Sequence, residues 1–354
     1  MFSTYCEKDV TILLKDISGM VTPLGTKDRE RLIQSGTHYS QMLPLEYEPS
    51  PEYMAAYEQA LQLYSGITAD AVAVAAEKIW ADKGPDVVLV SLARAGTSIG
   101  VLIKRYLRLK YGVEAAHYTI SIIRGRGIDH NAMRCILTRH KPEKIQFVDG
   151  WTGKGAIQRE LNAAMEAYPG VSPGLAVLSD PARVAEKCGT HEDFLIASSC
   201  LNATVSGLMS RTFLRSDIIG PNDYHGAAFY RELQGKDLTY QFIGAVEKNF
   251  RFDLEPGAGI RGSDEYAGRN GLDEVYEISK HFGISDINLI KPGIGEATRV
   301  LLRRMPWKLL VYRLDDNLHL GHLYQLAREK GAAVVEYPLR CYKACGLIRS
   351  IADT

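Results

Sequence analysis

The sequence has no net charge and no apolar run long enough to cross a membrane. Its 42 Lys and Arg residues balance 42 Asp and Glu residues, so any basic surface for a polyanion must be local. The first residues contain no apolar signal region, and we expect neither a secretory leader nor a membrane partner. We therefore expect a cytoplasmic protein in which the sequon at residues 202–204 is not glycosylated.

Cysteine is also scarce, with six cysteines among 354 residues and most of them far apart. Only Cys341 and Cys345 lie close together, and no second Cys or His pair completes a zinc-binding pattern. Scattered cysteines in a long chain favour free thiols in a reducing compartment. The sequence thus argues against a disulfide-stabilised secreted fold and assigns no residue as a metal ligand.

What the sequence does contain is a repeated alternation of strands and helices. Hydrophobic residues make up 46% of a chain long enough for two domains. Apolar spacing predicts helices over residues 50–64 and 68–83, and buried-strand patterns alternate with helical ones over residues 87–157. This alternation predicts an α/β fold with a doubly wound, Rossmann-like parallel sheet, and a ligand at the carboxyl ends of its strands.

A break in composition divides the chain near residue 255. Residues 255–263 are rich in glycine, and a compact α/β/α pattern follows them. We expect one domain over residues 1–255, a linker over residues 256–271 and a second domain over residues 272–354.

The most informative stretch is the loop that follows the apolar strand pattern at residues 145–148. Asp149 ends the strand, and a glycine-rich turn leads into a helical pattern from Ala156. Such turns present backbone N–H groups and a helix N-terminus to an anion, which predicts a phosphate site. The loop is not a Walker A motif, because Gly155 follows Lys154 where that motif needs Ser or Thr. An ordinary strand–turn–helix connection is the alternative.

Two further loops follow neighbouring strands of the same predicted sheet. Residues 93–97 form a loop of small residues around Arg94, and Arg124 and Arg126 belong to a basic loop with glycine hinges. Because ligands in such sheets bind outside the carboxyl ends of the strands, we expect all three loops to meet there.

In this order the three loops resemble those of type I phosphoribosyltransferases. Over most of its length the chain is similar to the phosphoribosyltransferase-like proteins encoded with tellurium-resistance (Ter) stress operons, a family also labelled cysteine protease StiP. Residues 93–96, 121–124, 147–156 and 201–211 carry the resemblance. It implies an enzyme that uses phosphoribosyl pyrophosphate (PRPP) and Mg²⁺ to ribosylate an unidentified base or RNA-linked acceptor, in a stress response or in nucleoside biosynthesis.

The resemblance also implies roles for individual residues. Asp149 would bind the ribose hydroxyls, and Arg124 and Arg126 would close over the leaving group; these three are the predicted catalytic residues. Guanidinium groups and backbone donors suit the charge of pyrophosphate, and in this family the peptide bond near Arg94 is commonly cis. The predicted PRPP-binding residues are Ala93, Arg94, Ala95, Gly96, Thr97, Asp149, Gly150, Trp151, Thr152, Gly153, Lys154 and Gly155.

The last segment resembles the Pelota/L7Ae-type RNA-binding fold. Residues 295–299, Gly-Glu-Ala-Thr-Arg, stand where that family has Asn-Glu-x-x-Lys at a helix start. The resemblance implies that Glu296 contacts a guanine edge and that Arg299 and Arg303 contact phosphate. The predicted RNA-binding residues are Gly295, Glu296, Arg299 and Arg303. A solvent-exposed helix face is the alternative.

Two other functions stay open. Gly150 stands where the PRPP loop has a second acid, which favours a catalytically inactive PRPP-fold protein with an RNA-binding or regulatory role. A cysteine protease needs a Cys–His pair, and Cys200 with His191 or His225 is the candidate arrangement. No local protease signature surrounds Cys200, and free cysteine is most often a small buried apolar residue. A homodimer is among the expected states.

Overall fold

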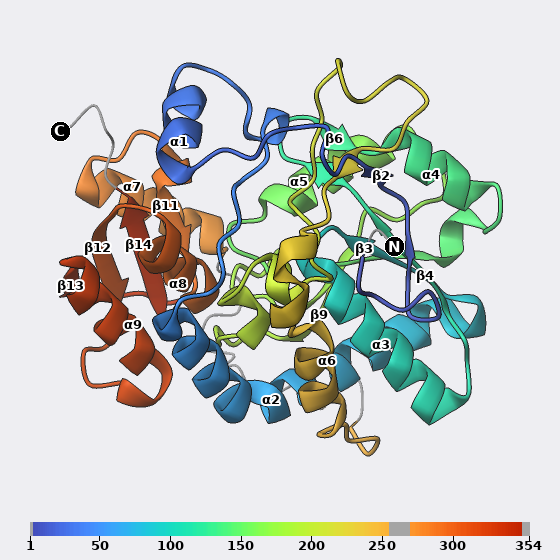
Figure 1. The fold of residues 1–354 in the computed structure, drawn as a ribbon. Helices are drawn as coiled ribbons and strands as arrows, with labels where there is room; N and C mark the ends of the chain where they lie inside the picture. The colour runs from blue at the N-terminus through green and yellow to red at the C-terminus, as the bar shows by residue number, and fades with distance from the viewer. Residues whose placement is uncertain (1–2, 255–269, 349–354) are drawn as a thin grey trace.

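The computed structural model describes residues 3–254 and 270–348, and Figure 1 follows the chain through them. Most of the predicted linker, residues 256–269, lies outside the described part, so the domain boundaries stay a prediction. Within the described residues, no helix is long and apolar enough to span a membrane.

The larger segment is built around a six-stranded parallel sheet in the order β1-β4-β3-β7-β8-β9. The central strands β3, β7 and β8 consist of buried residues, as continuous apolar runs predict for a sheet covered on both faces. The α/β class and the parallel sheet predicted from the sequence are therefore confirmed. The strands are β1 (Thr11–Ile12), β3 (Val88–Leu92), β4 (Ala116–Ile120), β7 (Ile145–Val148), β8 (Leu175–Ser179) and β9 (Lys187–Thr190).

Helices cover both faces of this sheet (Figure 1). One face carries α2 (Pro51–Lys83), α3 (Ala95–Tyr111) and α6 (Thr239–Glu247), whose buried side chains share an apolar core with Leu89. The other face carries α4 (His130–Leu137) and α5 (Ala156–Met165), which pack on Val88 and Val90. The alternation of residues 88–90 between the two cores is the period of two expected in a strand. Smaller elements are α1 (Thr26–Gln34), β2 (Lys15–Asp16) paired with β10 (Gly226–Ala227), and the hairpin of β5 (Ile122–Ile123) and β6 (Gly127–Ile128).

The prediction of two helices over residues 50–64 and 68–83 is wrong, because these residues form the single helix α2 of 33 residues. Gly66 does not end it, since buried side chains continue through both halves, including Tyr64 and Ala69. Their packing outweighs the cost of one glycine in a helix, which is about 1 kcal/mol.

The C-terminal segment has a four-stranded sheet in the order β11-β14-β12-β13, with helices on both faces. Strand β14 runs antiparallel to β11 and β12, and β12 runs parallel to β13. Side chains of α8 and α9 pack on one face and those of α7 on the other, as the α/β/α pattern predicts. The elements are α7 (Gly271–Phe282), β11 (Ile290–Pro292), α8 (Ile294–Arg303), β12 (Pro306–Val311), α9 (Asn317–Lys330), β13 (Ala333–Glu336) and β14 (Ala344–Ile348).

The two segments pack directly on each other. Apolar residues of α8 and α9 belong to the same core as those of α2 and α3. Polar contacts cross the same junction: the Tyr53 hydroxyl donates to the carbonyl of Leu302, and the Gly271 N–H donates to the carbonyl of Ala182 at 3.0 Å. The start of α8 therefore faces the loops at the carboxyl edge of the large sheet.

Candidate functional site

The three predicted loops do converge at the carboxyl edge of the parallel sheet. Gly96 lies so close to the strand β7 that a Cβ there would sit 2.5 Å from the Val148 carbonyl oxygen. The Gly125 N–H of the β5–β6 turn donates to Glu160 of α5 at 2.6 Å. The peptide bond between Ala93 and Arg94 is cis, as the resemblance implies. The structure therefore brings these loops close together, as the sequence predicted.

The polar groups of the first loop are engaged by the protein itself. The guanidinium of Arg94 donates to the Met209 carbonyl at 2.6 Å and to Asn202 Oδ1 at 2.8 Å, and it forms an ion pair with Glu46 at 3.4 Å. The Thr97 hydroxyl is bonded to that of Thr119 at 2.7 Å. Ala95 begins α3. Arg94 is thus held as a structural ion-pair partner.

The predicted phosphate loop is also occupied by protein contacts. Lys154 is 8% exposed, and its Nζ donates to the carbonyls of Ile287 and Ile290 in the C-terminal segment. Burial lowers the pKa of this lysine to about 8. The Thr152 hydroxyl donates to Asp180 Oδ1 at 2.5 Å, and the Gly153 carbonyl accepts from the Tyr342 hydroxyl at 2.6 Å. The loop therefore serves as a docking point for the C-terminal segment.

Of the predicted catalytic residues, Asp149 is bonded within its own loop, and the two arginines are exposed. Asp149 Oδ1 accepts from the Gly150 N–H at 2.8 Å, and burial raises the pKa of its carboxyl to about 6. Arg124 and Arg126 are exposed on the β5–β6 turn. The Arg124 guanidinium lies 5.9 Å from the ring centre of Tyr39. No contact between Asp149 and either arginine is recorded among the described residues.

The predicted RNA-binding residues at the start of α8 face the N-terminal segment. Arg299 forms an ion pair with Glu296 at 3.2 Å, donates to the Ser199 carbonyl at 3.3 Å and stacks 4.6 Å from the Trp151 ring centre. A Cβ at Gly295 would lie 3.4 Å from the Ser199 hydroxyl, so this turn of the helix is also at the junction. Arg303 lies in the last turn of α8, and its side chain is outside the described part.

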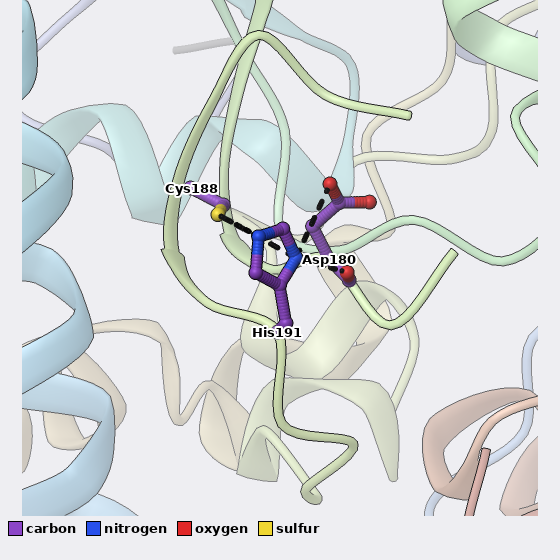
Figure 2. A group of neighbouring side chains, drawn as sticks. All are labelled: Asp180, Cys188 and His191. Carbon is purple, nitrogen blue, oxygen red and sulfur yellow. Dashed lines mark hydrogen bonds and ion pairs between the residues drawn. The ribbon is translucent and has the colours of Figure 1, made fainter. Parts of the chain in front are cut away.

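A cysteine–histidine pair is found on the strand β9 and the residue after it (Figure 2). Cys188 Sγ lies 3.7 Å from His191 Nε2 and 3.9 Å from His191 Nδ1. His191 Nδ1 lies 2.8 Å from the main-chain carbonyl oxygen of Asp180. Because a carbonyl oxygen only accepts, Nδ1 must carry the proton, and Nε2 of the neutral ring is then the acceptor. Nε2 is therefore the basic nitrogen of the ring, 3.7 Å from the thiol sulfur.

The thiol is held in its neutral form in this geometry. Cys188 is 6% exposed, and burial raises the pKa of its thiol to about 11. The two similar sulfur–nitrogen distances place Sγ beside the ring rather than on the lone-pair axis of Nε2. Proton transfer therefore requires a rotation of the imidazole, whose side chain is 36% exposed and has room to turn.

Asp180, Cys188 and His191 also offer three potential metal ligands within 4.8 Å of one another. The Asp180 carboxylate, however, already accepts from the Thr152 hydroxyl at 2.5 Å and from the N–H groups of Val184 and Ala185 at 3.1 Å. Only one sulfur and one nitrogen remain, whereas structural zinc sites use four protein ligands. The donor set fits a Cys–His pair supported by an aspartate better than a metal site.

The candidate pairing of Cys200 with His191 or His225 stays a prediction. Cys200 is fully buried after the short 3₁₀ helix at Ala197–Ser199, and His191 contacts Cys188. His225 is bonded through Nδ1 to the Ser121 hydroxyl at 2.8 Å. The C-x-x-H spacing of residues 188–191 was the available signal for this pair.

A cleft of about 520 Å³ lies between the two segments. Residues from the ranges 44–53 and 201–211 line it on the N-terminal side. Its lining includes five cations from both segments: Arg29, Arg211, Lys291, Arg299 and Arg304. Three acids, Glu46, Glu48 and Glu296, also line it. The cleft thus carries a local excess of positive charge in a chain that has no net charge.

Comparisons with known proteins point to one family. A family model described as "Tellurite-like stress resistance cysteine protease StiP" matches residues 3–247, and one described as "PELOTA RNA binding domain" matches residues 269–350. An Acinetobacter baylyi protein named "Cysteine protease StiP" is 35% identical over 365 residues, covering 98% of this chain and 94% of that protein. The solved structure of Helicobacter pylori xanthine-guanine-hypoxanthine phosphoribosyltransferase covers 32% of this chain and 70% of its own, with 19% identity and a TM-score of 0.24, a likeness too weak to support a conclusion.

These names contradict the function first predicted from the sequence. The family and the relative are both named as cysteine proteases, so the prediction of phosphoribosyl transfer from PRPP is wrong, and so is that of an inactive PRPP-fold regulator. The contacts explain the error: two of the groups expected to hold PRPP, Arg94 and Lys154, are bonded to carbonyl groups of the chain. The expectation of an enzyme agrees with the names. The expected Mg²⁺ ion and homodimer stay predictions.

Proposed function

The chain belongs to the StiP family, and from this premise we propose that it is a cysteine-dependent peptidase that acts in stress resistance. In this proposal Cys188 is the nucleophile and His191 is its base. The contact between Cys188 Sγ and His191 Nε2 at 3.7 Å is the observation that carries it. Asp180 supports the pair through its main-chain carbonyl, which holds the tautomer of His191.

The chemistry of the pair follows the general course of thiol peptidases. His191 Nε2 takes the thiol proton, and the thiolate of Cys188 attacks the carbonyl carbon of a peptide bond. The imidazolium then gives that proton to the leaving amine, which leaves an acyl group on sulfur. Water, deprotonated by the same nitrogen, releases the carboxylic acid and restores the thiol.

The structure represents the resting form in this proposal. The pKa of the Cys188 thiol, raised to about 11 by burial, leaves little thiolate at neutral pH. Binding of a peptide beside His191 would turn the imidazole toward the sulfur and form the ion pair. The Asp180 carboxylate, 3.7 Å from His191 Nδ1, would then favour the imidazolium.

Hydrolysis of fluorescein-labelled casein by variants of the full chain tests the proposal. Cys188→Ala and His191→Ala should each abolish hydrolysis, because each removes one partner of proton transfer. Cys135→Ala is the matched control, since Cys135 is partly exposed like a surface thiol. Cys200→Ala tests the other candidate nucleophile. Full hydrolysis by Cys188→Ala would overturn the assignment.

We further propose that the C-terminal segment binds RNA. The match of residues 269–350 to a Pelota RNA-binding model and the local excess of cations support this function. Phosphate contacts by such cations make binding sensitive to salt, so the salt dependence of RNA affinity is the measurement that tests it.

For the fold we propose a finer classification than α/β. The strand order β1-β4-β3-β7-β8-β9 supports a type I phosphoribosyltransferase-like sheet that no longer carries that activity. The order β11-β14-β12-β13 with three helices supports a Pelota/L7Ae-like second domain. Superposition of a crystal structure of this chain on members of both folds tests the classification.

A further inference from the structure

The cationic cleft lies outside the Cys188–His191 pair and joins the two segments. Arg211 comes from the loop before β10, and Lys291 comes from β11 in the C-terminal segment. None of the loops 93–97, 124–126 and 149–155, which the sequence marked for phosphate, is among its lining residues. The residues that line the cleft are therefore different from those of the three loops.

Each acid of the cleft already has a basic partner. Glu46 pairs with Arg94 at 3.4 Å and Glu48 pairs with Lys236 at 2.6 Å. Glu296 pairs with Arg299 at 3.2 Å. Among the described residues, neither Arg211 nor Lys291 has a recorded ion pair, so two positive charges remain for a ligand.

Both cations of the cleft lie where burial and neighbouring cations disfavour their charged forms. Burial and the neighbouring charges of Arg29 and Arg94 lower the pKa of Arg211 to about 10. Burial likewise lowers the pKa of Lys291, and Arg124 and Arg304 lower it further, although Glu296 opposes them. A bound anion would offset both the lost hydration and the repulsion from these neighbouring cations.

We propose that this cleft binds the phosphate group of a nucleotide, with Arg211 and Lys291 as its two charged contacts. The volume of about 520 Å³ lies within the range of small-molecule sites, which is about 300–1,000 Å³. Tyr47 lines the same cleft with 64% of its surface exposed and offers a ring on which a base can stack.

The phosphate has two sources with the same chemistry: a free nucleotide and the 5′ end of an RNA strand. The RNA source rests on the RNA binding proposed above, whereas the free-nucleotide source does not. Because the ligand contacts both segments, it also stabilises their junction. Binding should therefore raise the melting temperature, and above the Kd the rise should grow with the logarithm of the ligand concentration.

Calorimetric titration of the full chain with adenosine 5′-monophosphate (AMP) tests the proposal. AMP should bind at least about tenfold more tightly than adenosine, because only AMP offers the charge-assisted contacts. Arg211→Met and Lys291→Met should each weaken AMP binding by about tenfold or more. Lys291→Arg keeps the charge and should bind nearly as well as the parent protein.

The controls separate this site from other surfaces. Arg231→Met and Lys280→Met remove exposed cations from the two segments and should leave AMP affinity unchanged. If Arg211→Met fails to fold, the AMP affinity of Lys291→Met alone tests the proposal. Cys188→Ala should bind AMP normally, so a failure of the peptidase proposal leaves this one standing.

An octauridylate with and without a 5′-phosphate distinguishes the two sources. The site is assigned to the end of an RNA strand if the phosphorylated strand binds more tightly than AMP and if Lys291→Met loses this tighter binding. Equal binding of both strands, with AMP binding that Lys291→Met weakens, assigns it to a free nucleotide. Failure of AMP and the phosphorylated strand to bind, or an unchanged affinity in Lys291→Met, overturns the proposal.

Discussion

Asp193 accepts a hydrogen bond from the backbone N–H of Ile294 at 3.0 Å, and this contact joins the two segments of the chain. Asp193 follows the strand β9, and Ile294 is the first residue of α8. The same carboxylate accepts from the Lys343 N–H at 2.9 Å. A carboxylate at a helix start satisfies otherwise unpaired donors and interacts favourably with the helix dipole. One side chain, 5% exposed, thus positions the C-terminal segment.

Asp193 predicts a specific pH dependence of stability. Burial raises the pKa of this carboxyl from 3.8 to about 6 in the folded chain, so the folded state binds the proton more tightly than the unfolded state. Its stabilising contribution is full below about pH 3.8 and is lost as the pH rises through about 6. Asp193→Asn does not titrate, so its melting temperature relative to the parent protein should rise between pH 4.5 and pH 7.5.

Asp223→Asn is the matched control with the opposite sign. A hydrogen bond from Lys15 lowers the pKa of Asp223, so its contribution is present above its ordinary pKa and is lost on acidification. The melting temperature of Asp223→Asn relative to the parent protein should therefore stay constant between pH 4.5 and pH 7.5, because the contribution of Asp223 changes only below its ordinary pKa of 3.8. Equal pH profiles for Asp193→Asn and the parent protein would contradict the first prediction.

Gly189 sets the distance between β9 and α2. A Cβ at this position would lie 2.4 Å from the Ala71 carbonyl oxygen and 2.6 Å from its Cα, which are backbone atoms. We expect Gly189→Ala to destabilise the chain by about 1–3 kcal/mol, as overpacking does, and to displace Cys188 from His191. Thermal unfolding together with casein hydrolysis measures both effects.

Gly66→Ala provides the contrasting variant. Gly66 lies inside α2, and a Cβ there meets nothing within 4 Å. Alanine should stabilise this helix by about 0.5–1 kcal/mol.

The prediction for Gly189 would be contradicted by a Gly189→Ala chain that is as stable as the parent protein and hydrolyses casein fully. Such a result would show that β9 tolerates a shift away from α2.

The sequence predicted the large sheet well because its signal is local. Strands such as β3 and β7 are short, mostly apolar runs in which every residue is buried, and burial on both faces favours such runs. The strand β9 was missed because Lys187-Cys188-Gly189-Thr190 has neither a long apolar run nor alternation. It is a strand because it pairs with β8 and packs on α2, which is distant in sequence.

The candidate site was predicted only in part for a related reason. The convergence of three loops follows from parallel topology, and it was anticipated. That Lys154 would donate to carbonyls of residues 287 and 290 could not be anticipated, because it depends on how the second segment docks. The same docking turns Arg299 toward Trp151. Local motifs indicate which groups are available, and tertiary packing decides their partners.

Lys154→Ala should therefore affect stability rather than phosphate binding. The change leaves the carbonyls of Ile287 and Ile290 without this donor at a buried junction. An unsatisfied buried acceptor costs about 1–3 kcal/mol, so a clear drop in melting temperature is expected. Lys141→Ala, at an exposed lysine, is the control and should melt like the parent protein. An unchanged melting temperature in Lys154→Ala would mean that water replaces the lysine at no cost.

Arg299 should contribute to RNA binding mainly through its charge. Its guanidinium is already stacked 4.6 Å from the Trp151 ring centre and paired with Glu296, so it is positioned before any RNA arrives. Arg299→Ala should weaken RNA binding and reduce the slope of log affinity against log salt by about 1. Arg299→Lys keeps the charge but loses the planar stack, so it should retain the slope while melting at a lower temperature. A salt slope in Arg299→Ala equal to that of the parent protein would place the phosphate contacts elsewhere on the C-terminal segment.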